Sequence, residues 1–229
     1  MKILVTGATS GLGRNAVQYL LQSGESVVAT GRNCEVGRSL TNAGAQFVAL
    51  DLTEATEDDC ARLMDGCDAV WHCAAKSSPW GDKTAFWLAN VKVTHTLAQA
   101  AGRLNIPRFI HISTPAVYFD FQHHYDLPET YLSRAFSSHY ASSKYAAEQV
   151  IAGAVSRYSA TRFILLRPRG LFGPHDQVIV PRLMQQLQQG GGCLRLPRGG
   201  DALLDLTFVQ NVVYAMRLVI ADVVNTARA

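Results

Sequence analysis

The chain has 229 residues, of which 48% are hydrophobic and 17% are charged, and its formal net charge is +3. This composition suits one well-buried core and is short for two full domains. The charges are dispersed, which argues against a nucleic-acid partner, and no apolar run approaches the ~20 residues of a membrane span. Five cysteines without zinc-type spacing and an apolar start that breaks at Gly7 lead us to expect a cytoplasmic protein with reduced thiols.

The N-terminal segment has the order strand, glycine turn, helix. Residues 2–6 are short and apolar, residues 7–13 read Gly-Ala-Thr-Ser-Gly-Leu-Gly, and residues 14–22 carry apolar side chains at helical spacing up to a cap at Gly24. Glycines in such a turn let the backbone approach a pyrophosphate, which the N–H groups of the helix then bind. The segment therefore predicts dinucleotide binding, with an ordinary tight turn as the alternative.

Alternating strand and helix patterns continue to residue 166 and predict an α/β, Rossmann-type, doubly wound parallel sheet covered by helices on both faces. The predicted strands are 26–30, 46–50, 69–73, 108–113 and 162–166, and the predicted helices include 58–64, 86–104 and 139–157. Ligands of such sheets bind beyond the carboxyl ends of the strands. At or just past these ends lie Gly7, Arg32, Asp51, Ala74 and Thr114.

The pattern predicts three regions. Residues 1–170 form a dinucleotide-binding domain, which includes a long loop at 115–138 rich in His, Tyr and Phe. Residues 171–205 form a partial, small substrate-side excursion near the C-terminus, with prolines and two glycine clusters. Residues 206–229 return to the main domain as a strand and a helix, and we expect the chain to be C-terminally short because another strand should follow.

A tyrosine and a lysine stand four residues apart in the predicted helix 139–157. On a helix, Tyr140 and Lys144 share one face and lie one turn apart. A nearby ammonium favours the phenolate and lowers the pKa of the phenol, so the pair suits proton transfer to or from a hydroxyl. A solvated helix face is the alternative for this spacing taken alone.

Several further stretches follow the predicted strands in a particular order. They are Asp51-Leu52, His72-Cys73-Ala74-Ala75, Asn90-Val91, Ile112-Ser113-Thr114, Ala116-Val117-Tyr118 and the run from Arg167 to Pro174. With the glycine turn and the Tyr140–Lys144 pair, they resemble the extended short-chain dehydrogenase/reductase superfamily over nearly the whole chain. Residues 113–119 and 206–212 are most similar to its 3β-hydroxysteroid dehydrogenase-like group, which includes reductases of long-chain 2-alkyl-3-keto acids.

The resemblance implies roles for individual residues. Tyr140 is then the general acid/base, Lys144 tunes it and holds the nicotinamide ribose, and Thr114 hydrogen-bonds the substrate oxygen. Ser113 lies beside the nicotinamide. The implied cofactor-binding residues are Gly7, Thr9, Ser10, Gly11, Leu12, Gly13, Asp51, Leu52, Cys73, Ala74, Ala75, Ser113, Tyr140, Lys144 and Pro168.

The end of the second predicted strand indicates which cofactor binds. Enzymes that select NAD usually carry Asp or Glu there, but residues 29–33 read Ala-Thr-Gly-Arg-Asn. The guanidinium of Arg32 suits a 2′-phosphate, Gly31 leaves room for it, and Arg14 is a second candidate partner. We therefore predict that NADP is preferred and that NAD is the alternative; Arg32 as a plain surface residue is the competing interpretation.

The predicted function is interconversion of a secondary alcohol and a ketone on a lipid-like or sterol-like small molecule. Gly170 stands where nucleotide-sugar enzymes often carry asparagine. Trp80, Phe119, Tyr125 and Phe136 are candidates for an apolar pocket. A nucleotide-sugar epimerase or dehydratase is the alternative, and a non-enzymatic dinucleotide sensor is a lesser one.

Two pairs of neighbouring polar residues are candidates for ligand contacts. His175 and Asp176 follow the Gly-Pro turn, where they are substrate contacts or a solvated turn. His123 and His124 are expected in a surface loop, and no metal site is predicted. A homodimer is left open.

Overall fold

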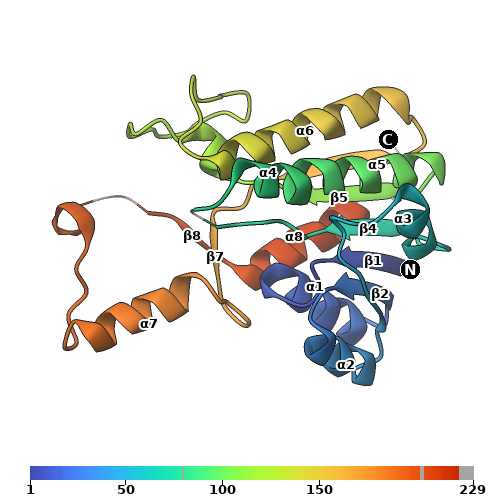
Figure 1. Ribbon diagram of the computed structural model, residues 1–229, viewed down its shortest axis with the longest axis horizontal. Coiled ribbons are helices and arrows are strands. Elements are labelled where there is room, and N and C mark those ends of the chain that lie inside the picture. The colour runs from blue at the N-terminus through green and yellow to red at the C-terminus, as the bar shows by residue number, and fades with distance from the viewer. Residues whose placement is uncertain (79, 202–203, 222–229) are drawn as a thin grey trace.

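The core of the molecule is a six-stranded parallel sheet (Figure 1), as predicted. The computed structural model describes residues 1–78, 80–201 and 204–221. The strand order is β3-β2-β1-β4-β5-β6, so that the chain winds outward in both directions from β1. The strands are β1 (Lys2–Thr6), β2 (Ser26–Gly31), β3 (Gln46–Ala49), β4 (Ala69–His72), β5 (Arg108–Ile112) and β6 (Arg162–Leu166).

Helices cover both faces of the sheet and enclose two hydrophobic cores. On one face pack α1 (Gly11–Gln22), α2 (Cys34–Asn42) and α8 (Val209–Ala221), and on the other α3 (Glu57–Leu63), α5 (Val93–Arg103) and α6 (His139–Arg157). Successive residues of β1 serve opposite cores: Ile3 and Val5 face α1 and α8, whereas Leu4 faces α3 and α5. The near-continuous apolar strands follow from this burial on both sides.

Three local features differ from the sequence-based expectation. Helix α2 lies in a gap for which no helix bounds were predicted, and it is short and buries only Gly37 and Leu40. The predicted helix 86–104 begins earlier, as α4 (Lys83–Phe86), and passes through the π-helical segment η1 (Trp87–Lys92) before α5. The loop 115–138 opens with a 3₁₀ turn, η2 (Pro115–Tyr118).

The substrate-side excursion projects from one end of the sheet (Figure 1). It opens with β7 (Gly170–Phe172), contains α7 (Ile179–Gln189) and η3 (Pro197–Gly200), and is followed by β8 (Leu206–Phe208), with which β7 pairs in parallel. No residue of α7 is buried. The last part of the predicted region 206–229, residues 222–229, lies outside the described residues.

One buried amide joins this excursion to the main sheet. The Nδ2 atom of Asn15 donates to the carbonyl oxygens of Gly11 (3.0 Å) and Pro174 (2.7 Å), and its Oδ1 atom accepts from Gln210 (2.8 Å). Asn15 is fully buried. It therefore ties the start of α1 to the turn after β7 and to the start of α8.

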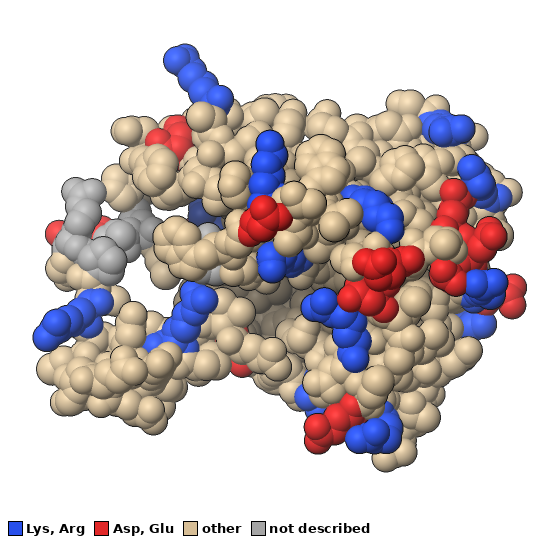
Figure 2. Space-filling view, in the orientation of Figure 1, with Lys and Arg blue, Asp and Glu red and all other residues tan. Residues whose placement is uncertain are grey.

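The surface of the molecule carries both signs of charge. Figure 2 shows Lys and Arg interspersed with Asp and Glu over the face in view, which is hollowed between the main body and the excursion. Among residues 1–78, 80–201 and 204–221, no helix is both long enough and apolar enough to cross a membrane.

Candidate active site

The glycine turn is built by backbone-on-backbone packing. Gly7 has φ = +64°, and a Cβ atom there would lie 2.8 Å from the backbone of Ala74. A Cβ atom on Gly13 would lie 2.2 Å from the carbonyl oxygen of Gly7. Only glycine fits at these two positions, because contacts of this length with backbone atoms cannot relax. Ser10 precedes α1 without capping it by its side chain, so this helix start is open to an anion.

A cavity of about 730 Å³ lies at the carboxyl ends of the strands, where the sequence predicted a binding site. It is bounded by the glycine turn, the ends of β4 and β5, the first turns of α6 and the excursion. Ten of the predicted site residues line it, namely Ser10, Gly11, Leu12, Cys73, Ala75, Ser113, Thr114, Tyr140, Lys144 and Pro168. The three predicted catalytic side chains thus share one cleft with the start of α1.

The remaining predicted cofactor residues lie beside or behind this lining. Gly7, Gly13 and Ala74 form the packed backbone behind the turn. Leu52 is buried in the core next to α3 and α5. Thr9, Arg32 and Asp51 lie together near the ends of β2 and β3.

Tyr140 lies in the first turn of α6, which Ser138 caps by accepting a hydrogen bond from the backbone N–H of Ala141 (3.1 Å). Burial raises the pKa of Tyr140, and a hydrogen bond with Thr114 acts in the opposite direction. The expected lowering of the Tyr140 pKa by Lys144 is not found in this structure. The reason is geometric, since the ammonium of Lys144 is bonded to the end of β5 instead.

Lys144 is almost completely buried, with 1% of its surface exposed. Its Nζ atom donates to the carbonyl oxygen of Ile112 (2.6 Å) and lies 3.1 Å from Nε2 of His111. Burial lowers the pKa of Lys144 to about 7, although the charges of Glu148 and Cys73 act to raise it. An amine that titrates near neutral pH in a cleft is typical of a functional site.

Thr114 and Ser113 have different environments despite being neighbours. The Oγ1 atom of Thr114 accepts a hydrogen bond from the backbone N–H of Ala116 (3.2 Å), and the residue is 8% exposed at the cleft. The hydroxyl of Ser113 donates to Oε1 of Glu148. Thr114 is therefore placed to face a ligand, whereas the Ser113 hydroxyl is engaged inside the protein.

A buried ion pair on α6, which the sequence analysis missed, supports this side of the cleft. Glu148 accepts two hydrogen bonds from Arg167, from Nε to Oε1 (2.8 Å) and from Nη2 to Oε2 (2.5 Å). The same guanidinium donates through Nη1 to the Tyr118 hydroxyl and to the carbonyl oxygen of Glu129. The available signal was the spacing of Glu148, four residues after Lys144 and so on the same face of the helix.

Asn90 holds the loop after β4 by hydrogen bonds. Its Nδ2 atom donates to the carbonyl oxygen of Lys76 (3.1 Å) and to Oγ of Ser143 on α6 (2.9 Å), and its Oδ1 atom accepts from the backbone N–H of Lys76 (2.8 Å). His72 is also buried and lies between the hydroxyls of Thr6 (2.8 Å) and Thr94 (3.0 Å). Burial lowers the pKa of His72 to about 3, so its ring is neutral.

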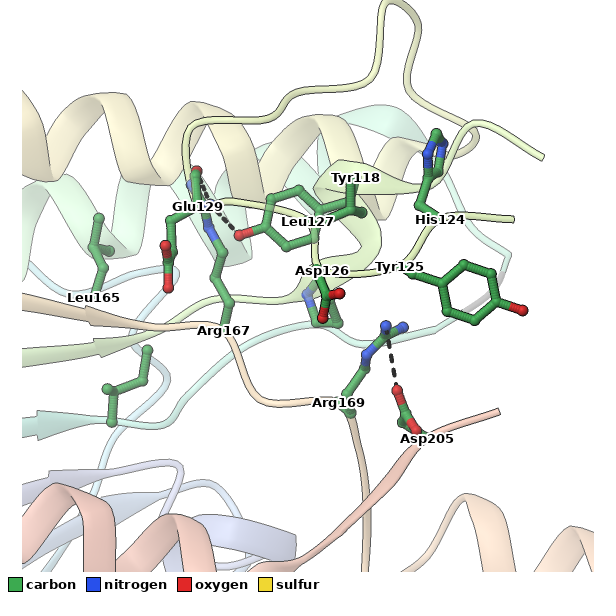
Figure 3. A pocket seen from close by; sticks show the side chains of 12 residues that line it. Tyr118, His124, Tyr125, Asp126, Leu127, Glu129, Leu165, Arg167, Arg169 and Asp205 are labelled. Atoms are coloured by element: carbon green, nitrogen blue, oxygen red, sulfur yellow. Dashed lines mark hydrogen bonds and ion pairs between the residues drawn. The ribbon is translucent and has the colours of Figure 1, made fainter. Parts of the chain in front are cut away.

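A second cavity, of about 740 Å³, lies between the loop after η2 and the link from β6 to β7 (Figure 3). It shares Pro115, Arg169 and Asp205 with the first cavity. Arg169 and Asp205 form an exposed ion pair of 3.4 Å.

Of the four aromatic side chains predicted to form an apolar pocket, only Tyr125 lines either of these two cavities. Trp80 is 83% exposed, Phe119 is about half exposed, and Phe136 stacks on Tyr145. The structure thus does not bring the four together.

Arg32, which is predicted to read the adenosine end of the cofactor, is highly exposed. The side chain of Arg32 is 78% exposed and reaches Asp51 with a 3.6 Å separation between Nη1 and Oδ2. The space expected to be open beside Gly31 is filled, because a Cβ atom there would lie 2.7 Å from Oγ1 of Thr9. Arg14 lies near His175. Burial lowers the pKa of His175, and the positive charge of Arg14 lowers it further.

The other polar residues singled out in the sequence have local partners. Nε2 of His124 lies 2.9 Å from both carboxylate oxygens of Asp120. His175 pairs with Gln18 (3.1 Å), and Asp176 accepts hydrogen bonds from the first N–H groups of α7. Within the part of the chain that the structure describes, no three His, Cys, Asp or Glu side chains are grouped to hold a metal ion.

Curated relatives with a named activity include oxidoreductases. The chain is 33% identical over 220 residues to the 2-alkyl-3-oxoalkanoate reductase of Shewanella oneidensis, covering 92% of this chain and 54% of that one. It is 49% identical over 218 residues to the uncharacterized protein YbjS of Escherichia coli (strain K12), covering 95% and 64%. The chain therefore spans just over half to just under two thirds of the length of these curated relatives.

Solved structures with the same fold include nucleotide-sugar enzymes. The UDP-glucuronic acid 4-epimerase of Bacillus cereus, solved with UDP-glucuronic acid and NAD, superimposes with a TM-score of 0.82. The alignment covers 96% of this chain and 73% of that one at 24% identity, so this likeness concerns the fold. The profile of the NAD dependent epimerase/dehydratase family matches residues 3–228. With the glycine turn, the cleft and this match over almost its entire length, the chain belongs to the NAD dependent epimerase/dehydratase family.

Proposed function

We propose that the protein is an NAD(P)-dependent oxidoreductase that interconverts a secondary alcohol and a ketone on a lipid-like or sterol-like substrate. The observation that carries this proposal is the convergence of Thr114, Tyr140 and Lys144 on the cleft that also holds the open start of α1. The cleft has backbone donors for a pyrophosphate and side chains for proton transfer. These features fit a nicotinamide dinucleotide, which would supply the hydride when bound.

Each side chain has a distinct part in the reduction. Because burial raises its pKa, Tyr140 is protonated at neutral pH and gives its proton to the substrate oxygen as negative charge develops there. The Thr114 hydroxyl donates a hydrogen bond to the same oxygen. Lys144 adds positive charge below its pKa of about 7. In alcohol oxidation, Tyr140 takes the proton back.

The substrate class is proposed from one glycine and from the relatives. A Cβ atom on Gly170 would lie 3.1 Å from both Ile179 and Leu206, so a longer side chain there would crowd the packing of β7. Gly170 has no side chain with which to make the asparagine contact that nucleotide-sugar enzymes often use. Relatives named as a 2-alkyl-3-oxoalkanoate reductase and as a sterol-4-alpha-carboxylate 3-dehydrogenase favour a lipid-like or sterol-like substrate.

A substrate panel tests this proposal. Purified protein is assayed with long-chain 3-keto acids, hydroxysteroids and UDP-sugars in the presence of either cofactor. Turnover of the first two groups is expected. Epimerisation of a UDP-sugar would contradict the proposal. It would favour the second candidate, a nucleotide-sugar epimerase, which is the activity named for a solved structure of the same fold.

We further propose that NADP is preferred over NAD. The exposed ion pair between Arg32 and Asp51 contributes little to stability. Arg32 can therefore turn toward a 2′-phosphate with a small loss of free energy. A charge-assisted bond of about 1.5–3 kcal/mol corresponds to a preference of roughly 10- to 100-fold. Calorimetric titration of both cofactors is expected to show this difference, and Arg32→Ala should abolish it. Equal or tighter binding of NAD by the unaltered protein would refute the preference.

A further inference from the structure

A second histidine lies beneath Lys144 and has no role in the mechanism described above. His111 is the fourth residue of β5 and is completely buried. Its Nε2 atom lies 3.1 Å from Nζ of Lys144, which is its only polar contact among the described residues. Its ring also packs against that of His72, with 5.1 Å between the centroids.

The chemistry of this contact determines which ring nitrogen carries the hydrogen. An ammonium group can only donate hydrogen bonds, so Nε2 of His111 accepts through its lone pair. In the neutral ring the hydrogen is then on Nδ1, and Nδ1 has no hydrogen-bond partner in the described structure. A buried donor without a partner is unfavourable, and an aliphatic residue in this strand would avoid it. Packing alone therefore does not account for the histidine.

The contact also determines how the ammonium group is oriented. Lys144 has three N–H bonds; one is directed to the carbonyl oxygen of Ile112 and one to His111. The third remains for a ligand in the cleft that Lys144 lines. We propose that His111 is a positioning residue, which accepts one N–H of Lys144 and so directs the remaining N–H toward the bound cofactor and substrate. This inference rests on the proposed function for the role of Lys144.

The charged and titratable groups around the ammonium are few. Glu148 lies one turn further along α6, and Cys73 and His72 belong to the end of β4. Both histidines are neutral, since burial and the charge of Lys144 lower their pKa values. Loss of the His111 acceptor removes a partner of the charged amine and should lower the pKa of Lys144. If the reaction needs the charged amine, the alkaline limb of its pH–rate profile then moves to lower pH.

The first test needs neither cofactor nor turnover. Imidazole nitrogen shifts in protein labelled with ¹⁵N-histidine report the tautomer of each ring, and His111→Gln identifies the resonance of His111 by its loss. The expected result is a neutral ring with hydrogen on Nδ1 between pH 5.5 and 6.5, where Lys144 is charged, and a change in that signal in Lys144→Met. A ring with hydrogen on Nε2, or one that becomes charged near pH 6.5, would overturn the inference, whatever the substrate is.

The second test separates positioning from mere packing. In His111→Leu, kcat should fall by roughly 10-fold or more and the alkaline limb of its pH profile should shift to lower pH. In His111→Gln, whose amide oxygen keeps an acceptor, most of the activity and the wild-type limb should remain. Phe109→Leu is the matched control, because Phe109 is a buried residue two positions earlier on the same face of β5 and offers no acceptor to Lys144.

The outcomes are distinguishable from those for the proposed function. If no ketone is reduced by the unaltered protein, the proposed function fails while the tautomer measurement still decides the contact. If ketones are reduced but His111→Leu and Phe109→Leu lose activity equally with unshifted pH profiles, His111 is only a packing residue and the inference is wrong.

Discussion

At the scale of single residues, the cleft combines a phenol that resists ionisation with an amine that gives up its charge easily. Tyr140 and Lys144 are both shifted by burial, and burial disfavours the charged form of each. Tyr140 is thus a neutral acid, and Lys144 beside it is an amine that titrates near neutral pH. Small changes at either side chain should therefore be visible in kinetics and in stability.

Replacing the phenol tests the proposed acid. Tyr140→Phe keeps the ring against Phe86, 6.4 Å away between centroids, and removes only the hydroxyl. Turnover of the ketone should fall by at least ~100-fold, the low end for general acid/base catalysis, with cofactor affinity largely kept. Steady-state kinetics and calorimetry measure the two effects. A ketone reduced by Tyr140→Phe at near wild-type rate would remove Tyr140 from the mechanism.

Replacing the amine tests its burial. The pKa of Lys144 falls from 10.5 to about 7 on folding, so between these values the unfolded chain holds one more proton than the folded protein. The stability of the wild type should therefore rise with pH in this range relative to Lys144→Met, by at most about 1.4 kcal/mol per pH unit. Urea unfolding of both proteins at pH 6.5, 7.5 and 8.5 measures this, and a constant difference would contradict it.

The sequence predicted the shared helix face of Tyr140 and Lys144 because that face depends only on spacing. It did not predict the partners of the ammonium, since Ile112 and His111 lie more than 30 residues away and are brought near only by the order of the strands. The effect expected on the Tyr140 pKa was wrong for the same reason. Contacts between distant segments determine where a flexible side chain points.

At the scale of elements, α6 carries most of the polar interactions of the cleft on a single face. Ser143, Lys144 and Glu148 are all at most 3% exposed and bond to η1, β5 and the segment after β6 respectively. These contacts place polar residues on the buried face of α6, which is why its apolar stripe is weak. The helix is positioned by hydrogen bonds as much as by hydrophobic burial.

Removal of one partner of the ion pair between Glu148 and Arg167 should therefore strongly destabilise the folded protein. Glu148→Leu leaves Arg167 without its carboxylate partner in a site where Arg167 is 20% exposed and Glu148 is 3% exposed. The free energy of unfolding should fall by about 3–5 kcal/mol, and the double variant Glu148→Leu/Arg167→Leu should recover much of the loss. Urea unfolding of the three variants checks this; equal losses in the single and double variants would show that the charge left behind is not the cause.

Elements of the main sheet were predictable from runs of apolar residues of sufficient length. The six strands of this sheet and the helices α1, α3 and α6 were expected within a few residues of their bounds. Helix α2 was given no bounds, since it is short and buries only Gly37 and Leu40, with the ring of Phe47 packed where a Cβ atom of Gly37 would be. Strand β7 is only three residues long, too short to show a period.

At the scale of the whole molecule, the parallel sheet and the excursion differ in how they are stabilised. The sheet is enclosed by two cores, whereas α7 leaves Val180, Leu183 and Met184 exposed. The doubly wound fold was predictable because alternation of strands and helices admits few topologies. The shape of the excursion was not, since its glycine- and proline-rich sequence carries little local signal.

This difference predicts unequal local stability. Amide hydrogens of α7 should exchange with solvent at least ~100-fold faster than those of α5, because α7 buries no side chain and α5 is enclosed. Hydrogen-exchange mass spectrometry at neutral pH measures both helices in one experiment. Equal protection of the two would mean that α7 is covered in solution.

The amide of Asn15 has a consequence for the order in which the protein forms during synthesis. Its partners are residues 11, 174 and 210, so the N-terminal strand–turn–helix unit leaves the ribosome long before two of them exist. Until residue 210 has emerged, the start of α1 holds a polar group that cannot be buried without loss of hydrogen bonds. This strand–turn–helix unit is thus translated before two of the partners that complete it, and a nascent chain that ends before residue 210 should bind a dinucleotide poorly.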